Sequence, residues 1–408
     1  MCNKCDDKHH IAGTAPADPA RRNVMRQGAG LAIGAAGGSL LAGLGGAAGA
    51  AQSSTPRSSM AEETVEAFGF REAGAPARSM QIQRRAVQAD DIKLDILYAG
   101  ICHSDIHYIN GDWNVSGVYP LVPGHEIIGR VTAVGANVTR FKVGDVAGVG
   151  CMVNSCGTCE NCLADREQNC LNGTTFTYAS EDRISGGLTD GGYSRKIVVR
   201  EHFAVNVPQQ LDLARAAPIM CAGITTFSPM QHWKLEQGQR VGVVGVGGLG
   251  HMAVKLAVAR GADVTAFTTT PGKVPQIEAM GATPVLWDDQ QAMQNLGNSF
   301  DLMISTVPYP FDIQQFMNLL KLDATLVNVG QLGQIDGLNG MMMGFGRKSL
   351  AGSMIGGMAE TQEVVNYCAE HNVQPDVELI RPDQINEAIS RVVDKDVKFR
   401  FVIDMQNA

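Results

Sequence analysis

The fold of this chain follows from residues 240–250, which read RVGVVGVGGLG. The apolar run at residues 240–245 predicts a buried strand, and a helical pattern follows at residues 251–260. The turn between them contributes five candidate cofactor-binding residues, Gly245, Gly247, Gly248, Leu249 and Gly250. A GxGxxG turn between a strand and a helix, with a further strand at residues 264–267, is typical of a dinucleotide-binding βαβ unit, because its glycines let the backbone approach a pyrophosphate. A βαβ turn that binds no nucleotide is the alternative.

Alternating strands and helices extend this unit toward the C-terminus. Further strands are predicted at residues 284–287, 301–306 and 324–330. Such alternation implies a parallel, doubly wound sheet. The tail after residue 361 has two helical stretches and ends in a strand at residues 398–404, which we expect to return to the first half of the chain.

The first half of the chain is β-rich. Runs with strand character occur at residues 91–97, 127–135 and 143–149, with glycine at the bends. The expected fold class is therefore α/β, with a compact β-rich domain and a doubly wound one. The chain has 408 residues, 45% of them hydrophobic, which is enough for two cores. A net charge of −8 without a run of Lys or Arg argues against nucleic acid as a partner.

The cysteine spacing indicates a structural metal site. The four residues concerned are Cys156, Cys159, Cys162 and Cys170. Four thiolates on one short loop satisfy a tetrahedral Zn²⁺ with no open position. An Fe–S site or disulfides are the alternatives. Cys151 and Cys368 lie outside this spacing, and we interpret them as ordinary buried thiols.

Three separated stretches offer ligands for a second, open zinc site. They read GICHSDIH at residues 100–107, PGHE at residues 123–126 and MCAG at residues 220–223. Two thiolates and one imidazole leave the fourth position of a tetrahedral Zn²⁺ free, which is the composition of a catalytic site. The ligands would be Cys102, His125 and Cys221. Because an open Zn²⁺ polarises a carbonyl or alcohol oxygen, the sequence predicts a zinc enzyme acting on alcohols or aldehydes.

The end of the strand at residues 264–267 decides the cofactor. NAD enzymes usually place Asp or Glu there for the ribose hydroxyls. This chain has Thr268 and Thr269 instead, followed by Lys273. A carboxylate would repel a 2′-phosphate, whereas hydroxyls and an ammonium bind it, so NADP(H) is favoured over NAD(H). The alternative is that the threonines only cap a helix.

From about residue 62 onward the chain resembles the zinc-dependent medium-chain alcohol dehydrogenases. Within that family it is most similar to the cinnamyl-alcohol-dehydrogenase-like branch, and closely similar to its bacterial NADPH-dependent aldehyde reductases. The motifs that carry the resemblance are GICHSDIH, VPGHEIIGRV, SCGTCENC, MCAGIT, GVGGLGHMAVKLA, AGSMIGG and VKFRFVID. The resemblance implies a GroES-like catalytic domain at residues 60–221 and 357–408, and a Rossmann NADP-binding domain at residues 222–356. It also implies a homodimer.

The resemblance assigns roles residue by residue. Glu126 would approach the metal when substrate is absent, and Asp105 would orient the ligands from behind. Ser104 would contact the substrate oxygen, and His107 would pass its proton toward solvent through the nicotinamide ribose. Thr225 would contact the cofactor. Ser104 as a helix cap and His107 as a surface histidine are the alternatives.

The implied activity is NADPH-dependent reduction of aldehydes to primary alcohols, and the reverse oxidation. Zinc would polarise the carbonyl, the nicotinamide would deliver hydride, and Ser104 and His107 would relay the proton. The substrate is a small molecule. A zinc-free quinone or enoyl reductase on the same fold is one rival, and an inactive nucleotide-binding protein is another. The intact ligand set argues against both. Trp113, Met354 and Ile355 are expected to border the substrate pocket.

Residues 1–59 read as a twin-arginine export leader and linker. RRNVMR at residues 21–26 precedes a Gly/Ala-rich apolar run at residues 28–51, with a small-residue cleavage site at residues 48–50. The run is too rich in Gly and Ala to make a good membrane anchor, so no stable anchor is expected. The expected compartment is the periplasm. A cytoplasmic product that starts at Met60 is the alternative.

Cell fractionation and N-terminal sequencing test the leader. We expect exported protein that begins near Ala51 or Gln52, and retention in the cytoplasm when Arg21→Lys and Arg22→Lys are combined, because the export route reads the arginine pair. A cytoplasmic protein that starts at Met60 and is indifferent to both changes would show that the leader reading is wrong.

Overall fold

The computed structural model describes residues 60–113, 115–330 and 333–406, which lie within one compact unit. The predicted twin-arginine leader lies outside the described residues. Across the described part, no helix combines the length and apolarity needed to cross a bilayer.

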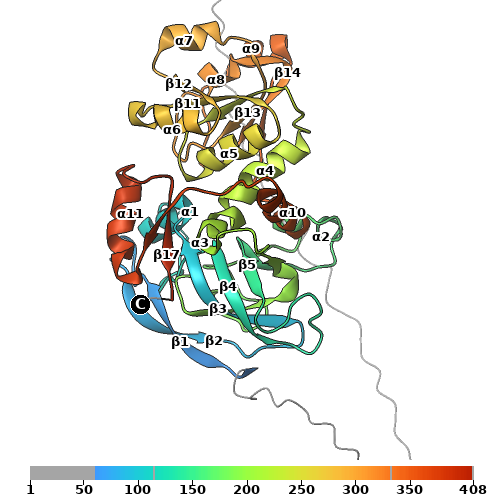
Figure 1. Ribbon diagram of the computed structural model, residues 1–408, viewed down its shortest axis with the longest axis vertical. Coiled ribbons are helices and arrows are strands. Elements are labelled where there is room, and N and C mark those ends of the chain that lie inside the picture. The colour runs from blue at the N-terminus through green and yellow to red at the C-terminus, as the bar shows by residue number, and fades with distance from the viewer. Residues whose placement is uncertain (1–59, 114, 331–332, 407–408) are drawn as a thin grey trace, which may run out of the picture. The chain divides into compact units, whose positions relative to one another are not determined.

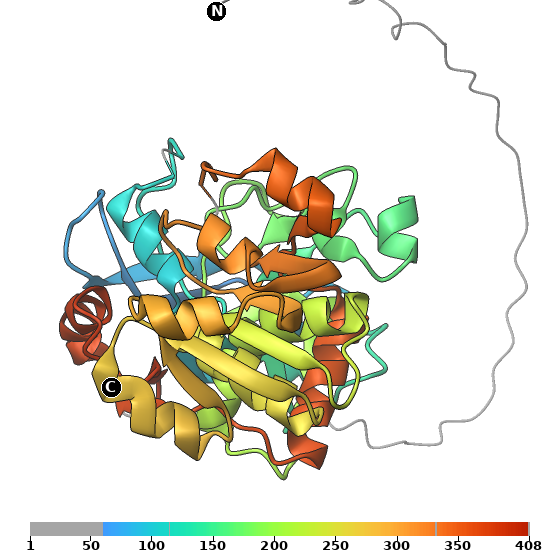
Figure 2. The same ribbon diagram turned by 90° about the horizontal axis from the view of Figure 1, so that it is seen from above.

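The dinucleotide-type half is built on a six-stranded parallel sheet in the order β12-β11-β10-β13-β14-β15. The strands are β10 (Arg240–Val244), β11 (Asp263–Thr268), β12 (Thr283–Leu286), β13 (Phe300–Ser305), β14 (Leu320–Asn328) and β15 (Ser349–Gly352). The central strand β10 is almost fully buried, because helices cover both faces of the sheet (Figure 1, Figure 2). The predicted doubly wound parallel sheet is confirmed.

Helices connect these strands. They are α5 (Gly248–Ala259), η6 (Pro271–Lys273), α6 (Val274–Ala279), α7 (Gln290–Asn295), α8 (Gln314–Met317) and α9 (Gly340–Gly346). Helix α5 begins at Gly248, three residues earlier than predicted, because the glycine-rich turn itself contributes the first helical turn. The sequence patterns did not predict β15 or α9.

The β-rich half is organised around β3 (Asp91–Gly100) in a seven-stranded sheet. The other strands are β4 (Ile127–Val134), β5 (Val146–Val149), β8 (Lys196–Arg200), β9 (Ala204–Asn206), β16 (Val377–Ile380) and β17 (Arg400–Asp404). Strand β17 pairs antiparallel with β3, with Val402 opposite Gly100, so the tail returns to this sheet as expected. Strand β5 begins three residues later than predicted, because Gly144 makes a turn at φ 96°.

Smaller elements surround this sheet. Two strand pairs are β1 (Glu63–Gly69) with β2 (Arg78–Arg84), and β6 (Met152–Asn154) with β7 (Thr175–Phe176). The helices are α1 (His103–Asn110), α2 (Glu160–Leu163), η3 (Glu167–Asn169), η4 (Glu201–Phe203), α3 (Leu213–Ala216), η5 (Ala217–Met220), α4 (Ala222–His232), α10 (Met358–Glu370), η7 (Pro382–Gln384) and α11 (Ile385–Val393).

Two strand-to-helix junctions place the chemistry. Strand β3 runs through Ile101 into α1, with Cys102 as the N-cap residue, and β10 runs through the glycine turn into α5. Both junctions line one cavity. The exact boundary between the two predicted domains stays a prediction.

Candidate metal and cofactor sites

Four buried side chains converge at the end of β3. The candidate ligand atoms of Cys102, His125, Glu126 and Cys221 all lie within 4.8 Å of one another. Cys102 caps α1, His125 and Glu126 directly precede β4, and Cys221 separates η5 from α4. The two sulfur atoms are 3.9 Å apart. The structure thus brings together the ligand set that the sequence predicted, from three distant parts of the chain.

The carboxylate of Asp105 contacts two of these candidate ligands, Cys102 and His125. Its Oδ2 accepts hydrogen bonds from the Cys102 N–H at 2.8 Å and from the Tyr193 O–H at 3.1 Å. Its Oδ1 lies 3.1 Å from His125 Nδ1. With Nδ1 turned toward Asp105, the Nε2 atom of His125 is the one left for a metal, and a carboxylate behind a ligand histidine is the usual arrangement in zinc sites.

Glu126 is fully buried beside Arg400. The Nη2 atom of Arg400 lies 2.9 Å from Glu126 Oε1, but neither carboxylate oxygen finds a well-aligned hydrogen-bond donor among the described residues. Burial raises the pKa of Glu126 to about 8, although Arg400 opposes this rise. Buried carboxylate oxygens without donors, next to two thiols and an imidazole, fit a bound cation. The donor set therefore suits Zn²⁺.

The second cysteine cluster is separate and nearer the surface. The candidate ligand atoms of Cys156, Cys159, Cys162 and Cys170 also lie within 4.8 Å of one another. Backbone N–H groups point at three of the sulfurs: Cys159 donates to Cys156, Leu171 to Cys159 and Cys156 to Cys170, at 3.3–3.4 Å. All cysteines of the described residues are free thiols, so the disulfide alternative has no support here. Four sulfurs around one point, with donors that stabilise thiolates, fit a closed tetrahedral zinc.

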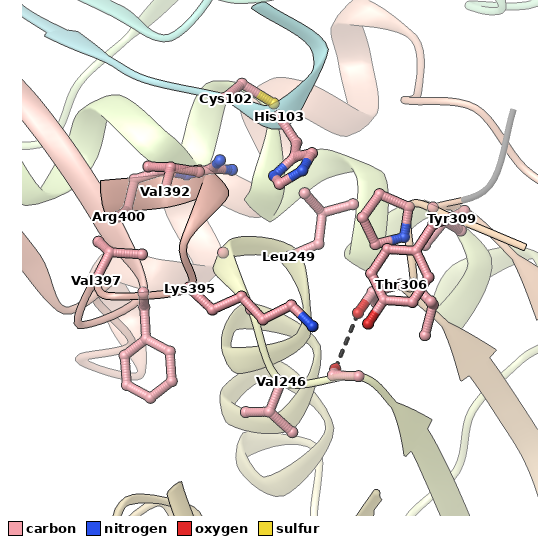
Figure 3. Close-up of a pocket in the computed structure, with 18 of the residues that line it drawn as sticks. Cys102, His103, Val246, Leu249, Thr306, Tyr309, Val392, Lys395, Val397 and Arg400 are labelled. Carbon is pink, nitrogen blue, oxygen red and sulfur yellow. Dashed lines mark hydrogen bonds between the residues drawn. The ribbon is translucent and has the colours of Figure 1, made fainter. Parts of the chain in front are cut away.

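The glycine turn leaves room for a dinucleotide. Gly245 has φ +85°, a conformation that residues with a Cβ atom rarely adopt. A Cβ at Gly250 would lie 1.9 Å from the carbonyl oxygen of Gly245, so only glycine allows this helix start. Gly247 faces open space. Thr306, the residue after β13, donates from Oγ1 to the Gly245 carbonyl at 2.9 Å and holds the turn in place (Figure 3).

The cavity beside this turn is cationic. It has a volume of about 200 Å³ and contains Thr268, Thr269 and Lys273, as predicted. Lys273 Nζ donates to the Val246 carbonyl at 2.7 Å, and burial, with Lys395 nearby, lowers the pKa of Lys273. No Asp or Glu is among the described residues that line this cavity. A cavity with lysines and without carboxylates suits a phosphorylated ligand.

A second, mainly apolar cavity of about 220 Å³ is lined by three of the candidate metal ligands, Cys102, His125 and Cys221. It contains the three expected pocket residues, Trp113, Met354 and Ile355, and also Thr225. Cys151 is only half-buried and lines this cavity, so the description of it as an ordinary buried thiol is wrong. Cys368 is fully buried, as expected.

Ser104 lines both cavities, and His107 lines the cationic one. The Oγ atom of Ser104 lies 3.8 Å from the sulfur of Cys102. His107 is partly exposed, and its Nδ1 lies 2.8 Å from Asp112 Oδ2 while its ring stacks on Trp113. The described residues contain no direct hydrogen bond between Ser104 and His107. Their relay therefore stays a prediction, which requires a further group between them.

Several residues of these sites were missed by sequence reasoning. They are Tyr178, Tyr193, Trp287, Tyr309, Lys395 and Arg400. Each lies on a strand end or loop, and no metal-ligand or glycine spacing marks it. Only Arg400 lay within a recognised motif, VKFRFVID.

Comparison with known families places the two halves separately. Residues 88–209 match the family described as "Alcohol dehydrogenase GroES-like domain", and residues 248–370 match "Zinc-binding dehydrogenase". A curated relative from Mycolicibacterium smegmatis, "NADP-dependent alcohol dehydrogenase C 1", is 48% identical over 84% of this chain and 98% of its own length. "Aldehyde reductase YahK" of Escherichia coli is 46% identical over 83% of this chain and 98% of its own length.

Solved structures agree. The cinnamyl alcohol dehydrogenase SbCAD4 of Sorghum bicolor superposes with a TM-score of 0.82 at 38% identity, over 85% of this chain and 99% of its own. A cinnamyl alcohol dehydrogenase of Helicobacter pylori, solved with NADP(H), superposes with a TM-score of 0.80 at 38% identity and the same coverage.

Elemental analysis and single substitutions separate the two metal sites. We expect two zinc ions per chain. Cys159→Ser loses one and lowers the unfolding temperature, since metal-binding energy at a closed site contributes to folding. Cys102→Ser loses the second zinc ion but stays folded. Its turnover should fall by more than about 100-fold, a larger loss than is typical when a residue that only supports a metal ligand is changed. The matched control is Cys368→Ala, which alters a thiol outside both clusters and keeps both ions. Fully active protein with one zinc or none contradicts the two-site assignment.

Proposed function

Because the chain belongs to the zinc-dependent medium-chain alcohol dehydrogenases, we propose that it reduces aldehydes to primary alcohols with NADPH and catalyses the reverse oxidation. The observation that carries this proposal is the meeting of the two cavities. Cys102, Ser104 and Leu249 line both the cationic cavity beside the glycine turn and the apolar cavity beside the metal ligands. A nicotinamide in the first would therefore face a small substrate in the second, next to the ligand cluster.

The chain's own residues provide the framework for this reaction. Cys102, His125 and Cys221 would hold the catalytic zinc, with Glu126 close enough to join them. When bound, zinc would act as a Lewis acid toward the carbonyl oxygen, and the reduced nicotinamide would supply hydride. Asp105 fixes the orientation of the histidine ligand.

We expect the proton donor among the residues that line both cavities. Hydride transfer reduces the carbonyl carbon, so the carbonyl oxygen must gain a proton. Ser104 lines both cavities, and its Oγ lies 3.8 Å from the Cys102 sulfur. His107 lies farther out, partly exposed and close to the Asp112 carboxylate, so it can exchange protons with solvent. We assign Ser104 as the proton donor and His107 as the outer relay residue.

The two rival functions fit the geometry less well. A zinc-free quinone or enoyl reductase does not need four buried ligand groups within 4.8 Å of one another. A nucleotide-binding protein without activity does not need an apolar cavity of about 220 Å³ that opens onto those groups.

Aldehyde-dependent NADPH oxidation by purified zinc-loaded protein tests the proposal. A panel of aliphatic and aromatic aldehydes should show turnover, with higher kcat/KM for NADPH than for NADH. No turnover with any aldehyde, or equal efficiency with both cofactors, would count against it.

Thr268→Asp should shift preference toward NADH, because it restores a ribose-binding carboxylate that repels a 2′-phosphate. Aspartate can still accept the hydrogen bond that Thr268 Oγ1 receives from the Thr270 N–H at 3.1 Å, so the local turn should survive.

We also propose that the protein is a homodimer. Strand β15 is an uncharged edge strand of the six-stranded sheet. Helix α9 precedes it and exposes Met341, Met342 and Phe345, the last at 81%. An uncharged edge next to an apolar helix is a template for pairing with a second copy about a two-fold axis.

Light scattering coupled to gel filtration measures this assembly. The unmodified protein should elute as a dimer, and Phe345→Glu should shift it toward monomer by placing a charge in the apolar contact. Val143→Glu, on an exposed turn before β5, is the matched control and should leave the dimer unchanged. A monomeric unmodified protein would contradict the proposal.

For the compartment, we propose export to the periplasm, supported by the arginine pair and the apolar run that follow the N-terminus. Export after folding would let the thiols of both clusters bind zinc before they meet an oxidising compartment. A soluble NADP(H) pool is not expected there, so turnover would require a tightly held or recycled cofactor.

A further inference from the structure

The segment between α11 and β17, residues 394–399, forms one wall of the cationic cavity. Lys395, Val397 and Phe399 all line it, together with Arg400 at the start of β17. Lys395 and Phe399 have φ angles of +60° and +75°, a region that residues with a Cβ atom rarely adopt. At Lys395 this conformation ends α11, where the Asp396 N–H donates to the Arg391 carbonyl at 2.8 Å.

Lys395 reaches from this wall toward the opposite half of the molecule. Its Nζ lies 5.2 Å from the centroid of the Tyr309 ring, on the loop after β13. Figure 3 shows the lysine side chain extending across the cavity toward Thr306 and Tyr309. The glycine turn, with Val246, borders the same space. Lys395 thus lies on the segment that leads into β17, in the β-rich half. The glycine turn and Lys273 lie on the half built around the six-stranded sheet.

Lys395 contacts the Tyr309 ring but has no ion-pair partner among the described residues. Among the described residues, no carboxylate lies within 4 Å of its Nζ, whereas the neighbouring Asp396 already pairs with Arg391 at 3.1 Å. Of the other two Lys and Arg side chains of the cavity, Lys273 donates to the Val246 carbonyl at 2.7 Å. Arg400 lies 2.9 Å from Glu126 and donates from Nη1 to the Ile101 carbonyl at 3.1 Å. An ammonium held over an aromatic ring in a cavity without carboxylates is available for an anion.

We propose that Lys395 binds a phosphate group of the dinucleotide from the wall opposite the glycine turn. This inference rests on the proposed function, since it takes NADP(H) as the ligand. The phosphate is either in the pyrophosphate or on the 2′-hydroxyl, and the chemistry of the contact is the same for both. Because Lys395 and the glycine turn come from different halves, a phosphate held by both ties the halves together and slows release of the cofactor.

Equilibrium binding of NADPH and NADH tests the contact without relying on turnover. Trp287 and Trp113 line the cavity, so quenching of tryptophan fluorescence reports binding. Lys395→Gln should raise the Kd for NADPH about 10-fold, the scale of one charge-assisted hydrogen bond, and make log Kd depend less steeply on salt. Lys395→Arg should restore most of the affinity, because it keeps the charge.

Two further variants guard the interpretation. Lys398→Gln removes a lysine from the same segment that does not line the cavity, and should change Kd less than about twofold, as expected for a screened surface charge. Lys395→Gly removes the ammonium while favouring the left-handed backbone at φ +60°, so it should fold at least as well as the unmodified protein and lose the same affinity.

The cofactor arms locate the phosphate. A loss confined to NADPH assigns Lys395 to the 2′-phosphate, and an equal loss for NADH assigns it to the pyrophosphate; either supports the proposal. The proposal is overturned if Lys395→Gln and Lys395→Gly both bind NADPH and NADH with the same Kd as Lys398→Gln. In that case, normal cofactor binding by the unmodified protein still leaves the proposed function intact. An unmodified protein that binds neither cofactor overturns both.

Discussion

The buried carboxylate of Asp105 is the constraint on which the rest of the candidate metal cluster depends. It lies in the first turn of α1 and satisfies the backbone N–H of Cys102, the N-cap residue of that helix. The same carboxylate faces His125 and accepts a hydrogen bond from Tyr193. A fully buried charge is tolerated only where several donors and charges surround it, so α1, the approach to β4 and the loop before β8 must meet at this one group. The position of two metal ligands follows from that requirement.

The segments around Asp105 pack so closely that only glycine fits at two of their contacts. A Cβ at Gly124 would lie 2.6 Å from the Tyr193 ring, and one at Gly100 would lie 2.0 Å from Glu126 Oε2. Arg84 stabilises the loop before β8, which contains Tyr193. Its guanidinium donates to the carbonyls of Asp190, Gly191 and Lys196. Glycine is therefore needed where the ligand segments touch, and a buried arginine supplies the donors that the neighbouring loop lacks.

Much of the fold and of the candidate site could be predicted because each feature is written in a short stretch of sequence. The glycine turn at Gly245–Gly250 has a fixed relation to the strand before it and the helix after it, since only glycine fits at φ +85° and at a 1.9 Å approach. The four-cysteine loop is equally local. Element ends were predicted less well, as with β5, where a turn at Gly144 delays the strand. Strand β15 was missed because its exposed, four-residue run carries no periodic signal.

The sequence by itself determined the fold class, the family resemblance and the set of candidate metal ligands, because local motifs encode backbone geometry and donor chemistry. Only the tertiary structure decided which side chains share a space. It brought Arg400 to 2.9 Å from Glu126, although 274 positions separate them, and placed Cys151 on the wall of the apolar cavity. It also placed Lys395 opposite the glycine turn. These contacts join segments that meet only when the two sheets and the helices and loops around them are packed together. No spacing along the sequence records such a meeting.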